Sequence, residues 1–307
     1  MAMQEVSPVV SAEGQTVQEG HPIIRRKVRF DWSDTQTHWV PDDPFTTHVI
    51  NVLHLLLPAG ERWFIDVVNK ARPLVHDEEL QERIKPFVQQ ESWHAWAHTV
   101  VLEHLAEQGI DTTAYTDRLE KQWFGRVLAD HPRWPRLLQR WWLNRRLAVV
   151  AAIEHYTCVL GKWVLENKGL EEAGADPVML DLLRWHGAEE VEHRSLVFDV
   201  HNEVSGSYLQ RVTTMLEVVF FLSLFWILGV QFLMRHDPTI PEGQPHKPRW
   251  RDWLRAARQN RIPSPSLLYG AAPRYIRPGH HPIQEASTRM ALDYLAHSPA
   301  ARAAQKG

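Results

Sequence analysis

The chain has 307 residues, with 34 basic and 37 acidic side chains and a formal net charge of −3. This length allows one large domain or one domain with appendages. The balanced charge gives no electrostatic reason to expect a nucleic-acid partner. A single cysteine, Cys158, excludes a disulfide framework and a thiolate-based metal site, so we expect a cytoplasmic protein.

Helical patterns cover nearly the whole chain. Residues 1–24 are expected to form a flexible leader, because they lack the apolar segment of a signal peptide. Asp43 and Pro44 are typical of a helix start, and Pro58 is expected to kink the helix that follows. The predicted helices cover 42–71, 77–108, 114–129, 135–167, 176–204 and 207–235. The sequence therefore predicts an all-α fold, with a helical bundle over 25–236.

The C-terminal third contains an apolar run and then a proline-rich segment. The run 218–230 is short for a bilayer span, so we favour a buried or partner-facing helix, and a membrane-surface contact through 218–234 stays open. Residues 237–307 are interpreted as a proline-rich extension with one short helix, followed by a last helix at 283–297. We expect this extension to pack on the bundle.

Two predicted helices each carry Glu-x-x-His. The second helix has Glu91 and His94, and the fifth has Glu190 and His193. Residues three or four apart share one face of a helix, so each pair points the same way. His98 and His186 lie on the same faces as these pairs.

The two remaining long helices each supply one glutamate in apolar surroundings, Glu61 and Glu154. Residues 147–153 contain no charge, so an ionised Glu154 there is costly unless a cation pairs with it. A single glutamate on each of two helices and Glu-x-x-His on two others is the ligand pattern of dinuclear carboxylate bundles. Four carboxylates balance the charge of two divalent cations, and we therefore predict a dimetal site.

Other polar residues near these positions are expected to support the ligands. They are His98, His155, Glu189 and Asp199. Glu189 shares a helical turn with His186 and His193, so it is also a competing ligand candidate. Glu192 is expected at the surface or beside the ligands.

The ligand helices, about 45–200, resemble the ferritin-like di-iron proteins. This resemblance implies a ferritin-like four-helix bundle with additional C-terminal helices. The pattern His-x-x-x-Glu-x-x-His is similar to that of the arylamine N-oxygenases of the p-aminobenzoate type. That similarity implies that His186 is also a metal ligand.

The stretches "QESWHAWAH" and "GADPVMLDLLRWHGAEEVEHRSLVFDV" resemble a bacterial family described as predicted metal-dependent hydrolase, over about 25–300. The carboxylate-rich ligand set favours two iron or manganese ions, whereas zinc is expected if the protein is a hydrolase.

Our leading hypothesis is an enzyme that activates O₂ to hydroxylate, desaturate or N-oxygenate a hydrophobic small molecule, with a separate electron donor. The alternatives are a two-metal hydrolase of an ester or phosphoester and a non-enzymatic iron-handling bundle. A homodimer is also left open.

Overall fold

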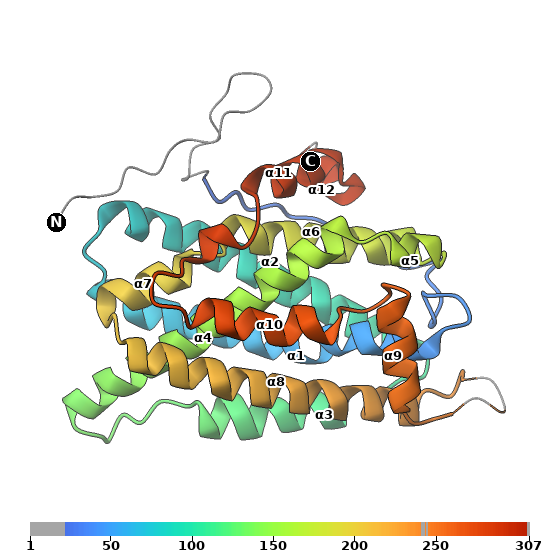
Figure 1. Ribbon diagram of the computed structural model, residues 1–307, viewed down its shortest axis with the longest axis horizontal. Coiled ribbons are helices and arrows are strands. Elements are labelled where there is room, and N and C mark those ends of the chain that lie inside the picture. The colour runs from blue at the N-terminus through green and yellow to red at the C-terminus, as the bar shows by residue number, and fades with distance from the viewer. Residues whose placement is uncertain (1–21, 241–242, 244, 306–307) are drawn as a thin grey trace.

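The computed structural model describes residues 22–240, 243 and 245–305. The predicted leader therefore lies outside the described residues except for its last three positions. One of these, Ile23, is buried in the hydrophobic core. All regular secondary structure among the described residues is helical, with no strand, as predicted (Figure 1).

Four long helices carry the predicted ligands. Their starts are set by the expected signals: the Asp43 carboxylate accepts from the Thr46 backbone N–H, and Asp77 and Asp176 cap in the same way. Proline follows Asp43 and Asp176 directly. The four helices are α1 (Pro44–Ala71), α2 (Glu78–Glu107), α4 (Arg136–Glu166) and α6 (Pro177–His193).

These helices pack as two pairs. The short η1 (Arg72–Leu74) joins α1 to α2, and α5 (Gly169–Glu172) lies between α4 and α6, so each pair runs antiparallel. The predicted helix at 114–129 consists of α3 (Thr113–Leu119) and the π-helical η2 (Glu120–Val127). Both pairs contribute apolar side chains to a shared core.

The predicted helix at 176–204 is wrong in one respect, because it is two helices. The first, α6, ends at His193, and α7 (Leu196–Val204) begins after a two-residue turn. The sequence has no glycine or proline there to signal the break. The Arg194 side chain turns inward and donates to the Ile283 carbonyl and the Thr288 hydroxyl, which ties this turn to the C-terminal segment.

The C-terminal region contains more helices than predicted. Ser264 caps a second helix that begins at Pro265, so residues 237–282 hold two helices instead of one. The last helix begins later than 283 and is followed by another short one. The elements are α9 (Trp250–Arg258), α10 (Pro265–Tyr275), η3 (Pro282–Gln284), α11 (Thr288–His297) and α12 (Pro299–Ala304). As Figure 1 shows, α10 lies across α4 and α8, and α11 and α12 lie on α6.

The apolar helix α8 (Tyr208–His236) lies along the outside of α1 and α4 (Figure 1). Only 22% of its 18-residue apolar window is buried, so of the two alternatives a buried helix is excluded and a partner-facing helix stays a prediction. The other helix long and apolar enough to cross a membrane, α4, is 72% buried over its window and belongs to the core. The length and apolar composition of α8, with most of its window exposed, are compatible with membrane association.

Candidate metal centre

All seven predicted ligands lie in the interior where α1, α2, α4 and α6 face one another. Each of these side chains is buried. Close approach of α4 and α6 depends on two facing glycines: a Cβ on Gly161 would lie 2.4 Å from the Gly187 carbonyl oxygen. Only residues without a side chain allow the two backbones to meet this closely. The ligands are Glu61 on α1, Glu91 and His94 on α2, Glu154 on α4, and His186, Glu190 and His193 on α6.

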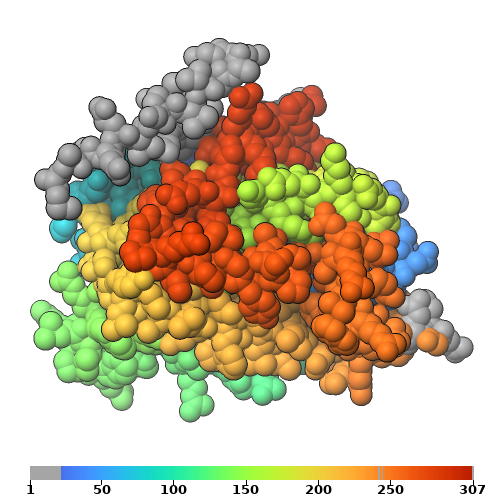
Figure 2. Space-filling view, viewed as in Figure 1, coloured from blue at the N-terminus to red at the C-terminus, as the bar shows by residue number. Residues whose placement is uncertain are grey.

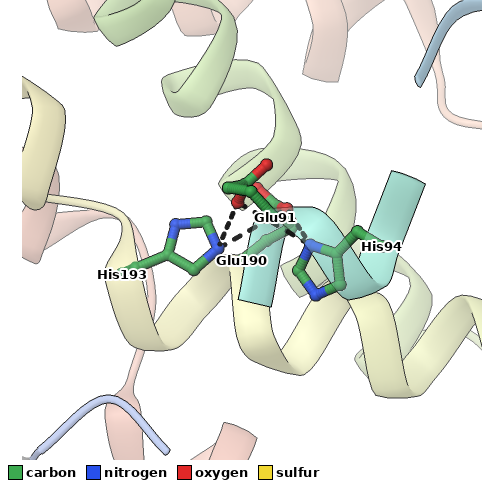
Figure 3. A group of neighbouring side chains, drawn as sticks. All are labelled: Glu91, His94, Glu190 and His193. Carbon is green, nitrogen blue, oxygen red and sulfur yellow. Dashed lines mark ion pairs between the residues drawn. The ribbon is translucent and has the colours of Figure 1, made fainter. Parts of the chain in front are cut away.

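The two Glu-x-x-His pairs meet face to face (Figure 3). The two imidazoles flank the two carboxylates, and one ligand atom from each residue lies within 4.8 Å of the others. The Nε2 atom of His193 is 3.1 Å from Glu91 Oε1 and 3.6 Å from Glu190 Oε1. The Nδ1 atom of His94 is 3.5 Å from Glu190 Oε1 and 3.7 Å from Glu91 Oε1.

A second group shares His94 with the first. It contains Glu61, His94 and His186, again with one ligand atom from each within 4.8 Å of the others. The Nε2 atom of His186 is 3.5 Å from Glu61 Oε1 and 2.8 Å from Glu190 Oε1. Glu154 adjoins the first group from the other side, where its Oε2 is 2.9 Å from His193 Nδ1.

Many donor atoms of this cluster lack a hydrogen-bond partner among the described residues. The buried atoms without a partner include both carboxylate oxygens of Glu61 and of Glu91, one oxygen each of Glu154 and Glu190, His94 Nδ1 and His193 Nε2. Leaving buried polar atoms unpaired costs about 1–3 kcal/mol each. So many together, all donor atoms of the kind that bind divalent metals, fit a site for metal ions.

Burial and mutual repulsion perturb the carboxyl groups. Burial, together with the nearby Glu91 carboxylate, raises the pKa of Glu61 well above its usual range. Burial and repulsion from Glu190 raise the pKa of Glu154 to about 8. Burial would also raise the pKa of Glu190, but the neighbouring His193 and His186 outweigh it and lower that pKa. Because two of these carboxyl groups have raised pKa values, divalent cations that bind here would release protons from them.

Nearby carboxylates raise the pKa of His94 and of His193 as well. Burial alone would lower the pKa of His94, but its contacts with Glu189 and Glu91 raise it well above the usual value. The pKa of His193 is raised for the same reason, by Glu190 and Glu154 against burial. Metal ions must displace these protons before either ring can serve as a ligand.

A buried ion-pair network contacts His94 on the side of its ring that faces away from the ligand cluster. The carboxylate of Glu189 accepts from His94 Nε2 at 2.9 Å, which leaves Nδ1 directed at the cluster. Arg26 donates to Glu189 at 2.9 Å and to Glu192 at 2.7 and 2.9 Å. Gln90 also donates to Glu192. Glu189 and Glu192 are thus buried beside the ligands, which is the second of the two positions expected for Glu192.

A chain of histidines extends from His186 away from the cluster. His186 Nδ1 lies 2.8 Å from His98 Nε2, and His98 Nδ1 lies 2.7 Å from His54 Nδ1. All three rings are buried. Each hydrogen bond fixes the tautomer of the next ring, so His98 and His54 orient His186 with its Nε2 toward Glu61 and Glu190.

Two of the predicted supporting residues face other parts of the molecule. The Nε2 atom of His155 is 3.2 Å from the Ala271 carbonyl oxygen on α10, and its ring packs on His280. His155, His280 and Glu285 form a separate buried group that resembles a metal site in residue type. Asp199 on α7 is partly exposed and accepts from His281 Nε2 at 2.9 Å.

Three contributors were not found from the sequence. His54 lies on α1 with no nearby carboxylate pattern, and Arg26 belongs to a segment without helical periodicity. Gln90 is adjacent to Glu91, and only its burial reveals its role. His54 precedes Glu61 by seven residues, so both lie on one face of the same helix. This spacing was the one sequence signal that placed His54 near the ligand cluster.

An apolar cavity of about 500 Å³ reaches this cluster from the surface. Its inner end includes His186 and Glu190, and its walls come from α1, α4, α6, α8, α9 and α10. Apolar side chains such as Leu53, Leu160 and Leu222 dominate these walls. Cavities of this size hold small organic ligands.

The fold and site define an all-helical protein with buried histidine and glutamate clusters suited to divalent metal binding. Residues 24–286 match the model of a family described as predicted metal-dependent hydrolase, and the chain belongs to that family. No curated protein and no solved structure matches the chain.

Proposed function

We propose that the protein is an enzyme with a dinuclear metal centre in a ferritin-like arrangement of α1, α2, α4 and α6. One observation carries this proposal: four glutamates and three histidines from four helices converge in the interior, and eight of their buried donor atoms have no hydrogen-bond partner among the described residues. The two groups overlap at His94, whose Nδ1 can bind one ion, and together they offer donor atoms for two ions. Glu154 and Glu61 supply carboxylates at opposite sides of this cluster.

The donor set favours redox metals. Four carboxylates and three imidazoles suit iron or manganese, whereas catalytic zinc sites hold fewer ligands per metal. When bound, such a pair of ions supplies the capacity to activate O₂, with electrons from a separate donor protein. The residues of the chain hold the ligands in place, exclude water through the apolar cavity, and bring the substrate to the side of the cluster where His186 and Glu190 lie.

The cavity indicates the kind of substrate. Its lining is mainly aliphatic and aromatic, with Thr157, Ser223 and Gln231 among its few polar side chains besides the ligands. A mostly apolar wall binds an apolar molecule and offers little recognition of a charged one. We therefore infer oxidation of a hydrophobic small molecule as the leading reaction.

Hydrolysis is the second candidate, and the family description supports it directly. A dinuclear site can activate water as a nucleophile toward an ester or phosphoester, with zinc or manganese as the metal. The same residues would hold those ions. In this case the apolar cavity would bind the acyl part of an ester.

Metal reconstitution separates these two reactions. The metal-free protein is loaded without oxygen with Fe(II), Mn(II) or Zn(II), and O₂ uptake and hydrolysis of a long-chain nitrophenyl ester are both measured. Reductant-dependent O₂ uptake in the iron form, absent from Glu91→Ala, supports oxidation. Ester hydrolysis by the zinc or manganese form without any O₂ requirement, also absent from Glu91→Ala, overturns oxidation in favour of hydrolysis.

A further inference from the structure

The outer face of α8 is a continuous apolar stripe. Its large exposed side chains recur every three or four residues and so share one face: Leu216, Phe220, Leu224, Ile227 and Leu228. Phe220 is 61% exposed. The best 18-residue window of α8 has a mean hydropathy of 2.1. In Figure 2, α8 forms an uncovered yellow-to-orange band across the face shown. An exposed apolar surface of this extent marks an interaction site.

The opposite face of α8 is packed against the bundle. The Trp226 indole donates to the Val49 carbonyl at 2.8 Å, and a Cβ on Gly229 would lie 3.0 Å from Val52 on α1. This packing holds α8 alongside the bundle helices. The helix therefore presents one side to its surroundings, as an interfacial helix does, instead of crossing a membrane alone.

Basic residues and tryptophans stand at both ends of the stripe, although the whole chain has a net charge of −3. At the N-terminal end, α8 adjoins the start of α4, where Gln210 donates to the Trp141 carbonyl. At the C-terminal end it packs against α9. The exposed basic side chains are Arg133, Arg136 and Arg140 at the first end, and Lys247, Arg249, Arg251, Arg255 and Arg258 at the second. Trp134 and Trp141 are exposed at the first end, and Trp250 at the second.

The cavity opens beside this stripe. Ile227, Trp250 and Tyr269 line the cavity and are also 46%, 70% and 55% exposed, so they form its mouth. The inner end is at His186 and Glu190. An apolar path therefore runs from the exposed face of α8 and α9 to the metal cluster.

We propose that the outer face of α8 docks on an anionic lipid bilayer and that the cavity takes an acyl chain directly from that bilayer. The stripe enters the acyl region, the tryptophans lie at the interface, and the basic clusters contact anionic headgroups. The assignment of a lipid acyl chain as the substrate rests on the proposed function. The docking of α8 on the bilayer does not.

Charge favours a bilayer over a second copy of this chain. Both ends of the stripe are basic, so pairing two copies through α8 in either direction would bring like charges together. Anionic headgroups oppose both clusters at once. Each arginine or lysine of the two clusters that lies near the membrane surface adds to the attraction between the protein and the anionic headgroups.

Vesicle binding tests the docking. The metal-loaded protein is mixed with vesicles of phosphatidylcholine alone or with phosphatidylglycerol, and bound protein is separated by flotation. We expect binding to the anionic vesicles, and at least about a tenfold loss of binding in the Phe220→Glu/Leu224→Glu variant. Trp96→Glu on α2 is the matched control, because Trp96 is also exposed (38%), and it should bind as the parent does. Metal content measured in every variant separates this test from that of the metal centre.

Photocrosslinking tests whether an acyl chain enters the cavity from the bilayer. A fatty acid with a diazirine near its methyl end is incorporated in the same vesicles, and crosslinked residues are mapped by mass spectrometry. Labelling of cavity residues such as Leu160 or Leu183 supports entry of the chain. Labelling confined to the outer face of α8 contradicts entry of the acyl chain into the cavity. Failure of the parent protein to bind anionic vesicles, or a dimer in solution that Phe220→Glu/Leu224→Glu converts to a monomer, overturns the docking.

Discussion

The buried pairing of Arg26 gives a prediction whose magnitude follows from the structure. Arg26 holds Glu189 and Glu192 at 2.7–2.9 Å, and all three side chains are nearly inaccessible to solvent. Burial would lower the pKa of Arg26, but Glu192 and Glu189 outweigh it and raise that pKa. Arg26→Met leaves the buried Glu192 without a cation and leaves Glu189 with the His94 ring alone. We expect the free energy of unfolding of the metal-free protein to fall by about 3–5 kcal/mol.

The measurement is denaturant unfolding followed by far-ultraviolet circular dichroism. Arg25→Met is the matched control, because Arg25 is the adjacent residue and is exposed, and we expect a change within about 0.5 kcal/mol. The double variant Arg26→Met/Glu192→Gln should recover part of the loss, since it removes one of the stranded charges. A loss in Arg26→Met no larger than that of Arg25→Met would refute the role given to this network.

Three further predictions follow from the site and its surroundings. Glu154→Ala should abolish binding of the metal pair, whereas Glu166→Ala, an exposed change on the same helix, should leave the metal content measured by elemental analysis unchanged. Burial lowers the pKa of His201 to about 4, so the unfolded chain binds the extra proton between about pH 6.5 and 4. Stability should therefore fall by about 3 kcal/mol from this group as the pH drops through that window, and His201→Phe should flatten the measured pH dependence. Gly187→Ala should push α6 from α4, lower stability by about 1–3 kcal/mol and reduce metal content. Gly270→Ala should do neither, because its Cβ would meet only the Arg274 side chain, at an ordinary contact distance of 3.7 Å.

The sequence was sufficient to predict the long helices and the polar side chains that share a helix face, because both follow from local rules. Aspartate caps followed by proline marked the starts of α1 and α6, and apolar periodicity marked their lengths. Glu-x-x-His places two ligands on one face whatever the tertiary structure. The structure brings Glu61 and Glu154 to the same interior as the two pairs, which local pattern alone could not place.

Other features depend on contacts between distant residues and were missed for that reason. Arg26 meets Glu189 at a separation of 163 residues, and nothing near Arg26 in the chain signals that partner. The break between α6 and α7 lacks glycine and proline, and it coincides with contacts from Arg194 to the C-terminal segment. The apolar composition of α8 gave no indication of which surroundings its outer face contacts, because a core and a bilayer favour the same residues.

The number and position of bound metal ions test the central claim most directly. A crystal of the Fe(II)-loaded protein, with anomalous scattering recorded at the iron edge, locates each ion. We predict two peaks, roughly 3.5–4 Å apart, enclosed by Glu61, Glu91, Glu154 and Glu190. A single peak, or ions bound only at another group such as that of His155 and His280, would contradict the account.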